Sequence, residues 1–298
     1  MNSDISTDSQ YQIKPPSPAD GTMPPDYELG ADHAVPEAAV AQLERDGVVC
    51  LRNALDIPMV EALRQEAAHA AANPCPESRF VGKPDAPGFF YYEFNIWRRY
   101  PVLRRLVFES HLPDMAQTLM RSKSVTLYYT NTFVKDGNAP DNMTPWHEDA
   151  SYHRLMGRNV INVNLTCDPM PAATTLKLKQ GSHLSDEPLY IGPTFEKGVE
   201  YDGSMDHQAP MPDQDELDRR YKTVYWEVFP GDALVFYQRT LHAAPANRLD
   251  SRRHSFAVIM AGDGVGYDAR SGPMDTPGHD PDLAHGAPPG GKVFSKLR

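Results

Sequence analysis

The chain has 298 residues, of which 29 are Lys or Arg and 40 are Asp or Glu, so its formal net charge is −11. Hydrophobic residues make up 40% of the chain, enough to bury a substantial core, and no apolar run approaches the roughly 20 residues that a membrane helix needs. The acidic balance disfavours a nucleic-acid partner, because binding to the phosphate backbone selects a basic face.

The N-terminal part of the chain is polar and rich in proline before helical patterns begin. We expect residues 1–30 to be disordered or draped on the surface, and residues 31–298 to form a single domain. Apolar residues at helical spacing predict helices over 37–44 and 57–72, and a short buried strand is predicted between them at 47–51. The stretch 99–120 predicts two further short helices, broken at Pro113.

Beyond residue 120 the apolar pattern changes from helical spacing to alternation, which is typical of strands. The predicted strands cover residues 126–135, 160–165, 175–179, 223–229, 233–237 and 254–261. The Pro- and Gly-rich stretch 272–291 predicts irregular coil. Helices followed by many short strands indicate an α+β fold in which the strands form a sandwich or an open barrel.

The cysteines and the N-terminus bear on the compartment. Cys50, Cys75 and Cys167 are far apart and form no Cys-x-x-Cys pair, which disfavours a disulfide framework and a structural zinc site. The first ten residues contain two aspartates and no basic residue, so we expect no secretory signal peptide. We therefore expect a cytoplasmic protein that is not bound to a membrane.

The segment 144–149, which reads TPWHED, carries the most informative pattern. In an extended chain His147 and Asp149 point to the same side, whereas Glu148 points to the other. One imidazole and one carboxylate are two of the three ligands of a 2-His-1-carboxylate site, which suits Fe(II). The third ligand must then be a distant His. By itself the pair also fits a solvated turn after Pro145.

The segment 231–242, which reads GDALVFYQRTLH, supplies such a distant ligand. It begins with a Gly-Asp turn, continues as a buried strand and ends at His242. Arg253 follows at the start of another predicted strand, where a guanidinium can hold a carboxylate through two hydrogen bonds. An iron site together with a carboxylate-binding Arg is what a 2-oxo acid cosubstrate requires.

These motifs together resemble the Fe(II)/2-oxoglutarate dioxygenases of the phytanoyl-CoA dioxygenase family. The matching features are His147-Glu148-Asp149, Gly231-Asp232, His242, Asn247, Arg253, and Gln180-Gly181-Ser182-His183, which has Gln where the family's turn has Pro. The resemblance spans about residues 40–260. It implies a double-stranded β-helix (jelly-roll) core, with His147, Asp149 and His242 binding iron. It also implies that Arg253, Asn131 and Asn164 bind 2-oxoglutarate, and that O₂ is the oxidant.

Alternation within the predicted strands agrees with a lined pocket. Asn162 and Asn164 share one strand face, and Asn131, Phe133 and Lys135 share another. The residues that we predict to contact substrate are Trp146, Tyr152, Lys135 and Tyr92. The other histidines of this region, His153, His183 and His254, are predicted to serve packing, surface or structural roles.

The expected function is hydroxylation of an unactivated C–H bond in a small organic molecule, with succinate and CO₂ as coproducts. Aromatic residues near the site favour an apolar or cationic substrate, such as a natural-product intermediate. Two alternatives remain: a cupin-like metalloenzyme that needs no 2-oxo acid, and a jelly-roll binding protein without turnover. Asp149 disfavours a halogenase, in which a halide takes the carboxylate position. The sequence does not predict the oligomeric state, and a homodimer is one of the options.

Overall fold

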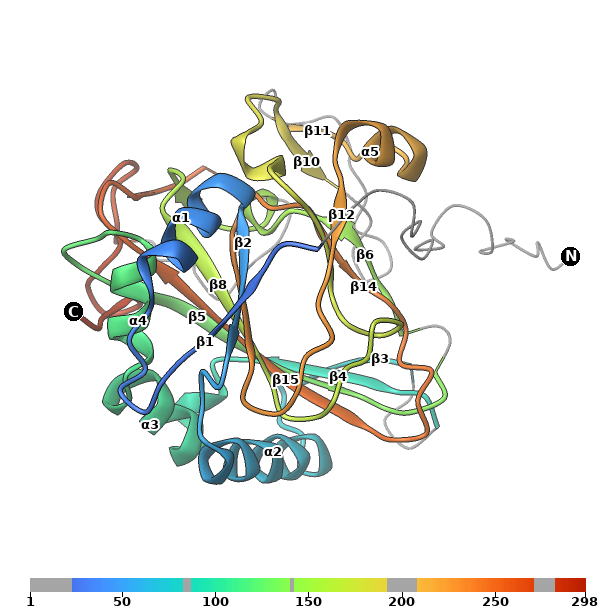
Figure 1. Cartoon of the computed structure of the whole chain (residues 1–298). Helices are drawn as coiled ribbons and strands as arrows, with labels where there is room; N and C mark the ends of the chain where they lie inside the picture. Colours follow the sequence, from blue (N-terminus) through green and yellow to red (C-terminus); the bar gives the residue numbers. More distant parts are fainter. Residues whose placement is uncertain (1–22, 83–86, 140–141, 192–207, 271–281) are drawn as a thin grey trace, which may run out of the picture.

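The computed structural model describes residues 23–82, 87–139, 142–191, 208–270 and 282–298 (Figure 1). In these residues, most strands belong to one nine-stranded sheet. Its strands, in spatial order, are β1 (Asp26–Glu28), β2 (Val48–Arg52), β13 (Ala233–Tyr237), β8 (Val160–Thr166), β15 (Arg253–Ala261), β5 (Thr126–Lys135), β4 (Phe90–Phe94) and β3 (Arg79–Val81), with β17 (Ser295–Lys296) also paired to β5.

A second, four-stranded sheet lies against the first and closes the site between them. Its order is β12 (Thr223–Val224), β9 (Lys177–Lys179), β14 (His242–Ala244) and β6 (Thr144–His147). Two small pairs complete the described strands: β10 (Leu189–Ile191) with β11 (Gln208–Pro210), and β16 (Gly266–Tyr267) with β7 (Leu155–Met156). The mixed fold with a jelly-roll core of two facing sheets confirms the fold class predicted from the sequence.

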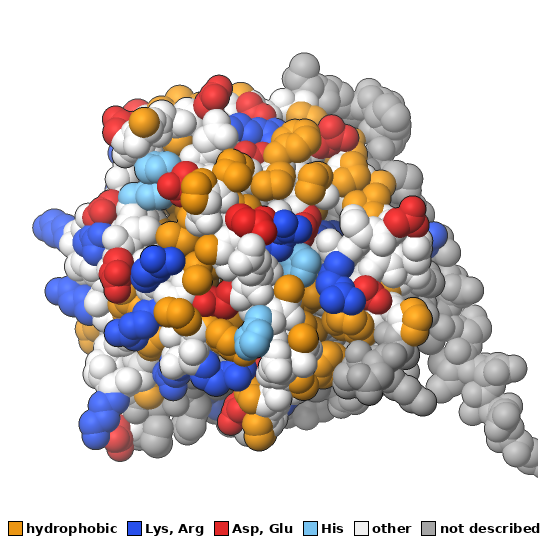
Figure 2. All heavy atoms as spheres, turned by 90° about the horizontal axis from the view of Figure 1, so that it is seen from below, with side chains coloured by type: hydrophobic (Ala, Val, Ile, Leu, Met, Phe, Trp, Pro, Cys, Tyr) orange, Lys and Arg blue, Asp and Glu red, His pale blue; other side chains and the backbone are white. Residues whose placement is uncertain are grey.

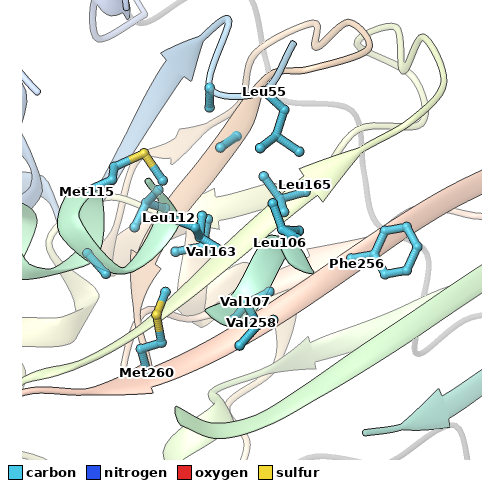
Figure 3. Packing of buried hydrophobic residues seen from close by; sticks show 14 of the residues in the cluster. Leu55, Leu106, Val107, Leu112, Met115, Val163, Leu165, Phe256, Val258 and Met260 are labelled. Atoms are coloured by element: carbon cyan, nitrogen blue, oxygen red, sulfur yellow. The ribbon is translucent and has the colours of Figure 1, made fainter. Parts of the chain in front are cut away.

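Helices cover the outer face of the large sheet (Figure 1). They are α1 (Glu37–Asp46), α2 (Ile57–Ala72), α3 (Pro101–Glu109) and α4 (Leu112–Leu119). Figure 3 shows Leu106, Leu112 and Met115 of this layer packed toward alternate residues of β8 and β15, such as Val163 and Val258. The intervening residues of the same strands face the second sheet, so alternation divides each strand between a dry core and the candidate site.

Two glycines are required by the turns that they make. Gly47 ends α1 with φ of 78°, and a Cβ there would lie 2.3 Å from His183 Nδ1. Gly231 has φ of 96°, and its Cβ would lie 2.5 Å from the Leu55 carbonyl oxygen. Asp232, which follows it, accepts hydrogen bonds from Arg52 and from the Asn53 and Phe229 amides. The Gly-Asp motif is thus a structural turn.

The predicted elements occur with shifted boundaries. Pro113 does not break the helical stretch: α3 ends at Glu109, and Pro113 lies in the first turn of α4, where its missing N–H costs nothing. The strand predicted at 223–229 is reduced to Thr223–Val224 and an isolated bridge at Val228. The sequence pattern does not predict α5 (Gln214–Arg220) or the strands β1, β3, β4, β7, β10, β11, β14, β16 and β17.

The predicted irregular ends fall partly outside the described residues. Residues 1–22 and 271–281 of these ends lie outside the described residues. Asp26–Glu28 form β1, which pairs in parallel with β2, so part of the N-terminal segment is a strand rather than a loose surface segment. Residues 282–291 contain turns and bends without helix or strand, as predicted for their Pro- and Gly-rich sequence.

The exterior is mixed in charge. On the face seen from below in Figure 2, acidic and basic side chains are interspersed with hydrophobic ones. Within the described residues, no helix combines the length and apolar character that crossing a bilayer requires. Cys50, Cys75 and Cys167 are free thiols. The cytoplasmic location stays a prediction.

We expect Glu66→Ala to lower the free energy of unfolding by about 2 kcal/mol, measured by urea denaturation. Glu66 of α2 is buried, and its carboxylate accepts from the Val102 and Leu103 amides at 2.7 and 2.8 Å. These are orphan amides at the start of α3, so Glu66 joins two helices. Glu61→Ala is the matched control, because Glu61 is half-exposed and pairs with Arg64 on its own helix. Equal effects would contradict the assignment.

Candidate functional site

Three potential metal ligands converge between the two sheets. His147 ends β6, His242 begins β14, and the two residues are paired directly across these strands. Asp149 begins the short 3₁₀ helix η2 (Asp149–Ser151). Its Oδ1 lies 3.6 Å from Nε2 of each histidine, and one ligand atom from each residue falls within 4.8 Å of the others. The structure therefore brings together the three residues predicted as metal ligands.

The hydrogen bonds of the two imidazoles fit metal binding. His147 Nδ1 lies 2.8 Å from the Pro145 carbonyl oxygen, and His242 Nδ1 lies 2.9 Å from that of Thr240. A carbonyl accepts only, so each Nδ1 carries the proton and each Nε2 turns a lone pair toward Asp149. Burial lowers the pKa of His242 to about 4, which keeps this ring neutral near pH 7. Two imidazole nitrogens and a carboxylate suit Fe(II).

Neighbouring side chains orient the carboxylate. Asn162 of β8 donates from Nδ2 to Asp149 Oδ2 at 3.0 Å. Glu148 points away from the cluster, as alternation predicts, and binds Arg239 and the Tyr190 amide.

The Gln-Gly-Ser-His turn supports the strand that begins with His242. Ser182 Oγ donates to the Lys179 carbonyl at 2.7 Å and accepts from the Leu241 amide at 2.9 Å. His183 Nε2 lies 3.1 Å from the Glu44 carbonyl oxygen, which ties the turn to α1. His183 is thus structural, as predicted, and the turn fixes the residue immediately before His242.

A cavity of about 140 Å³ adjoins the three ligands. At one end, Lys135 and Arg253 are direct neighbours on β5 and β15, and both line the cavity. Burial lowers the pKa of Arg253 to about 10, and burial and then Arg253 lower that of Lys135 well below its usual value. Within the described residues, no carboxylate forms an ion pair with either cation, so this end suits an anionic ligand.

The hydrogen bonds of these cations leave room for such a ligand. Arg253 donates from Nη1 to the Thr174 carbonyl, and Lys135 donates to Thr144 Oγ1 at 3.1 Å. Asn131 and Asn164 also line the cavity, and the buried Asn131 Oδ1 has no hydrogen-bond partner among the described residues. All three residues predicted to bind the cosubstrate thus lie in one cavity with the metal ligands.

Two of the four residues predicted to contact substrate line the cavity, and two do not. Tyr152 and Lys135 line the cavity. Trp146 does not: it is on the strand face opposite His147, and its indole N–H donates to Gln214 of α5. Tyr92 packs against the cavity residues Phe90 and Phe94 and is not itself one of the described lining residues.

Several lining residues were not predicted individually. They are Tyr129, His153, Met170, Leu176, Phe236, Ala244, Ser255, Ala257 and Ile259. Alternation could have found some of them, since Tyr129 is two residues before Asn131 on the same strand face. His153 is not among the clustered ligands, but it lines the cavity and bonds Tyr129 and Gln238, so the predicted surface or packing role is incomplete. His254 is buried, with Nδ1 2.8 Å from Asp168 Oδ2.

Asn247, the last motif residue, has a structural place. Its buried side-chain nitrogen donates to the carbonyls of Lys135, Asp136 and Ser251 at 3.2, 3.1 and 2.9 Å. It thereby connects the loop between β14 and β15 to the end of β5. This connection fixes the chain just before Arg253.

Solved structures show the same fold. The alpha ketoglutarate dependent epimerase SnoN from nogalamycin biosynthesis superimposes with a TM-score of 0.67 at 22% identity, covering 88% of this chain and 98% of SnoN. The carbocyclase SnoK from the same biosynthesis gives 0.69 at 20% identity, covering 91% and 99%. EctD from S. alaskensis, solved with 2-oxoglutarate and 5-hydroxyectoine, gives 0.63 at 18% identity, covering 94% and 95%. SnoN was also solved with Fe3+, alpha ketoglutarate and nogalamycin RO.

Sequence comparison identifies the family. No curated protein sequence matches the chain. A family model does match, over residues 43–255, and this range includes all three clustered ligands and Arg253. The match covers well over half of the chain. The chain therefore belongs to the phytanoyl-CoA dioxygenase (PhyH) family.

Proposed function

We propose that this chain is a non-haem Fe(II)/2-oxoglutarate-dependent oxygenase that hydroxylates a C–H bond of a small organic molecule. The observation that carries the proposal is the convergence of His147, Asp149 and His242 beside a cavity whose far end holds Arg253. When bound, iron and 2-oxoglutarate together activate O₂ for C–H oxidation and give succinate and CO₂. The membership in the PhyH family supports this class of reaction.

The protein's own side chains have distinct tasks in the proposed site. His147, Asp149 and His242 hold the metal, and Arg253 holds the distal carboxylate of 2-oxoglutarate, with Lys135, Asn131 and Asn164 beside it. The aromatic lining excludes water from the reacting C–H bond. SnoN is an epimerase and SnoK a carbocyclase, so proteins of this fold catalyse reactions with different outcomes. We propose hydroxylation for this chain because it is the simplest outcome of this class of reaction.

The proposal is tested by adding Fe(II) and then 2-oxoglutarate to the full-length protein without oxygen. We expect a weak visible charge-transfer band when the 2-oxo acid chelates the iron. Succinate should form once O₂ is admitted. Metal binding without a 2-oxoglutarate-dependent band would reject the cosubstrate and favour a cupin-like metalloenzyme. A protein that binds neither would be a jelly-roll binding protein.

We expect Asn162→Ala to weaken iron binding about 10- to 100-fold, which is the usual cost of removing a group that orients a metal ligand. The amide of Asn162 holds Asp149 Oδ2, so without it the carboxylate can rotate away from the histidines. Iron affinity is measured by anaerobic competition with a chelator. Asn159→Ala is the control, because Asn159 bonds the Met120 carbonyl outside the cavity. An unchanged affinity in Asn162→Ala would contradict this role.

A further inference from the structure

Strand register separates the cavity into two ends. Lys135 pairs with Arg253 at one end of the β5–β15 ladder, whereas Tyr129 pairs with Ile259 six residues along β5. Six residues of strand span about 20 Å. Ile259 in turn pairs with Asn162, the residue that holds the metal ligand Asp149. The metal ligands therefore lie nearer Tyr129 than Arg253 along these strands. A cosubstrate directed from the metal toward Arg253 leaves the space beside Tyr129 for the second reactant.

A chain of three hydrogen bonds gives the Tyr129 hydroxyl a fixed direction. Gln238 donates from Nε2 to the Gly157 carbonyl at 2.9 Å, so its Oε1 faces His153. His153 Nδ1 lies 3.1 Å from that oxygen and must donate to it, which leaves Nε2 unprotonated. The Tyr129 hydroxyl lies 2.9 Å from Nε2 and therefore donates to it. Its oxygen can then offer the cavity only lone pairs.

The surroundings of this hydroxyl are mainly aromatic and apolar, and the metal ligand Asp149 is the charged side chain that acts on it. Phe94 meets the Tyr129 ring edge to face at 5.3 Å, and Ile259 is the direct neighbour of Tyr129 on β15. Apart from Asp149, the charged side chains among the described lining residues are Lys135 and Arg253, at the other end.

We propose that the Tyr129 end of the cavity binds a neutral substrate with an aromatic or alicyclic ring, and that Tyr129 accepts a hydrogen bond from a hydroxyl group on that ring. Tyr129 is the specificity-determining residue. His153 and Gln238 are positioning residues, because they act by holding the Tyr129 proton. That the ligand is a substrate rests on the proposed oxygenase function, whereas the binding preference does not.

The test compares three probes of one skeleton: 2-naphthol, which donates a hydrogen bond; 2-fluoronaphthalene, of similar size, which does not; and 2-methoxynaphthalene, which only accepts. Dissociation constants are measured by equilibrium dialysis on the full-length protein, both metal-free and anaerobically loaded with Fe(II) and 2-oxoglutarate. In Tyr129→Phe, the preference for 2-naphthol over 2-fluoronaphthalene should fall about tenfold relative to the wild type, the size of one hydrogen bond. An unchanged preference, or no binding of any probe, would overturn the inference.

His153→Leu provides a second, independent arm. Without His153, the Tyr129 hydroxyl is released to donate into the cavity, so 2-methoxynaphthalene should bind several-fold tighter than to the wild type. If His153 were merely structural, His153→Leu would weaken the binding of all three probes equally. That result would show that His153 is not a positioning residue. This gain also decides the question if Tyr129→Phe does not fold.

Failure of this inference is distinguishable from failure of the proposed function. If the metal-free protein shows the Tyr129-dependent preference but forms no Fe(II)–2-oxoglutarate band, the oxygenase proposal alone is wrong. If the band forms and the preference is absent, only the substrate class is wrong.

Discussion

His242→Ala is expected to abolish stoichiometric iron binding and, with it, 2-oxoglutarate-dependent succinate formation. The substitution removes one of three clustered ligands from a position paired directly with His147, and no other His, Cys, Asp or Glu of the described residues joins the cluster. The loss of iron affinity should exceed the roughly 100-fold upper range for changes outside the ligand set. The measurement is the iron-to-protein ratio after anaerobic desalting.

His183→Ala is the matched control for this prediction. His183 is also a buried histidine, but it bonds the Glu44 carbonyl and contributes no atom to the ligand cluster. It should therefore lower stability and still bind one iron per chain. A His242→Ala protein that retains iron as well as this control would remove His242 from the metal site.

Arg253→Ala should weaken 2-oxoglutarate binding by a factor on the order of 100 or more while leaving iron affinity intact. Two charge-assisted hydrogen bonds to a carboxylate contribute about 1.5–3 kcal/mol each, and Ala supplies neither. Arg253→Lys should recover only part of the affinity, because an ammonium cannot form the paired hydrogen bonds of a guanidinium. The dissociation constant is measured by titrating the visible band of the anaerobic iron complex.

The neighbouring residue supplies a close control. Arg252 precedes Arg253 in the chain, is exposed, and pairs with Asp136 outside the cavity. Arg252→Ala should leave 2-oxoglutarate affinity unchanged. If both variants lost affinity equally, the effect would reflect overall positive charge rather than a specific contact, and Arg253 would not be the anchor.

Local patterns in the sequence predicted much of this fold, because most strands and helices show their periodicity directly. The helix predicted at 57–72 coincides with α2, and the strand at 126–135 with β5. The missed elements have weaker signals. β4 reads FYYEF, with aromatic residues on both faces and no apolar–polar alternation, and α5 is only seven residues long. The start of α5 did carry a signal in the sequence, an Asp followed three residues later by a Glu. In the structure Asp213 caps the helix by accepting from the Glu216 amide.

The strand face on which a side chain lies was predictable from the sequence. Contacts between side chains of different elements were not. Alternation placed Asn131 and Lys135 correctly on one face of β5. The same rule, applied to Trp146, puts it opposite His147, and this is where the structure has it. His153 gave no such signal, because its importance depends on Tyr129 and Gln238, which are distant in sequence.

The adjacent placement of Lys135 and Arg253 couples anion binding to protons. Burial and the neighbouring guanidinium make the Lys135 amine hold its proton weakly. A carboxylate placed between the two cations would favour the protonated amine and raise its pKa. Binding of a dicarboxylate is therefore linked to proton uptake, and affinity declines as pH rises. In this way a pair of like charges, unfavourable in isolation, makes the site respond to both the concentration of its ligand and the acidity of the medium.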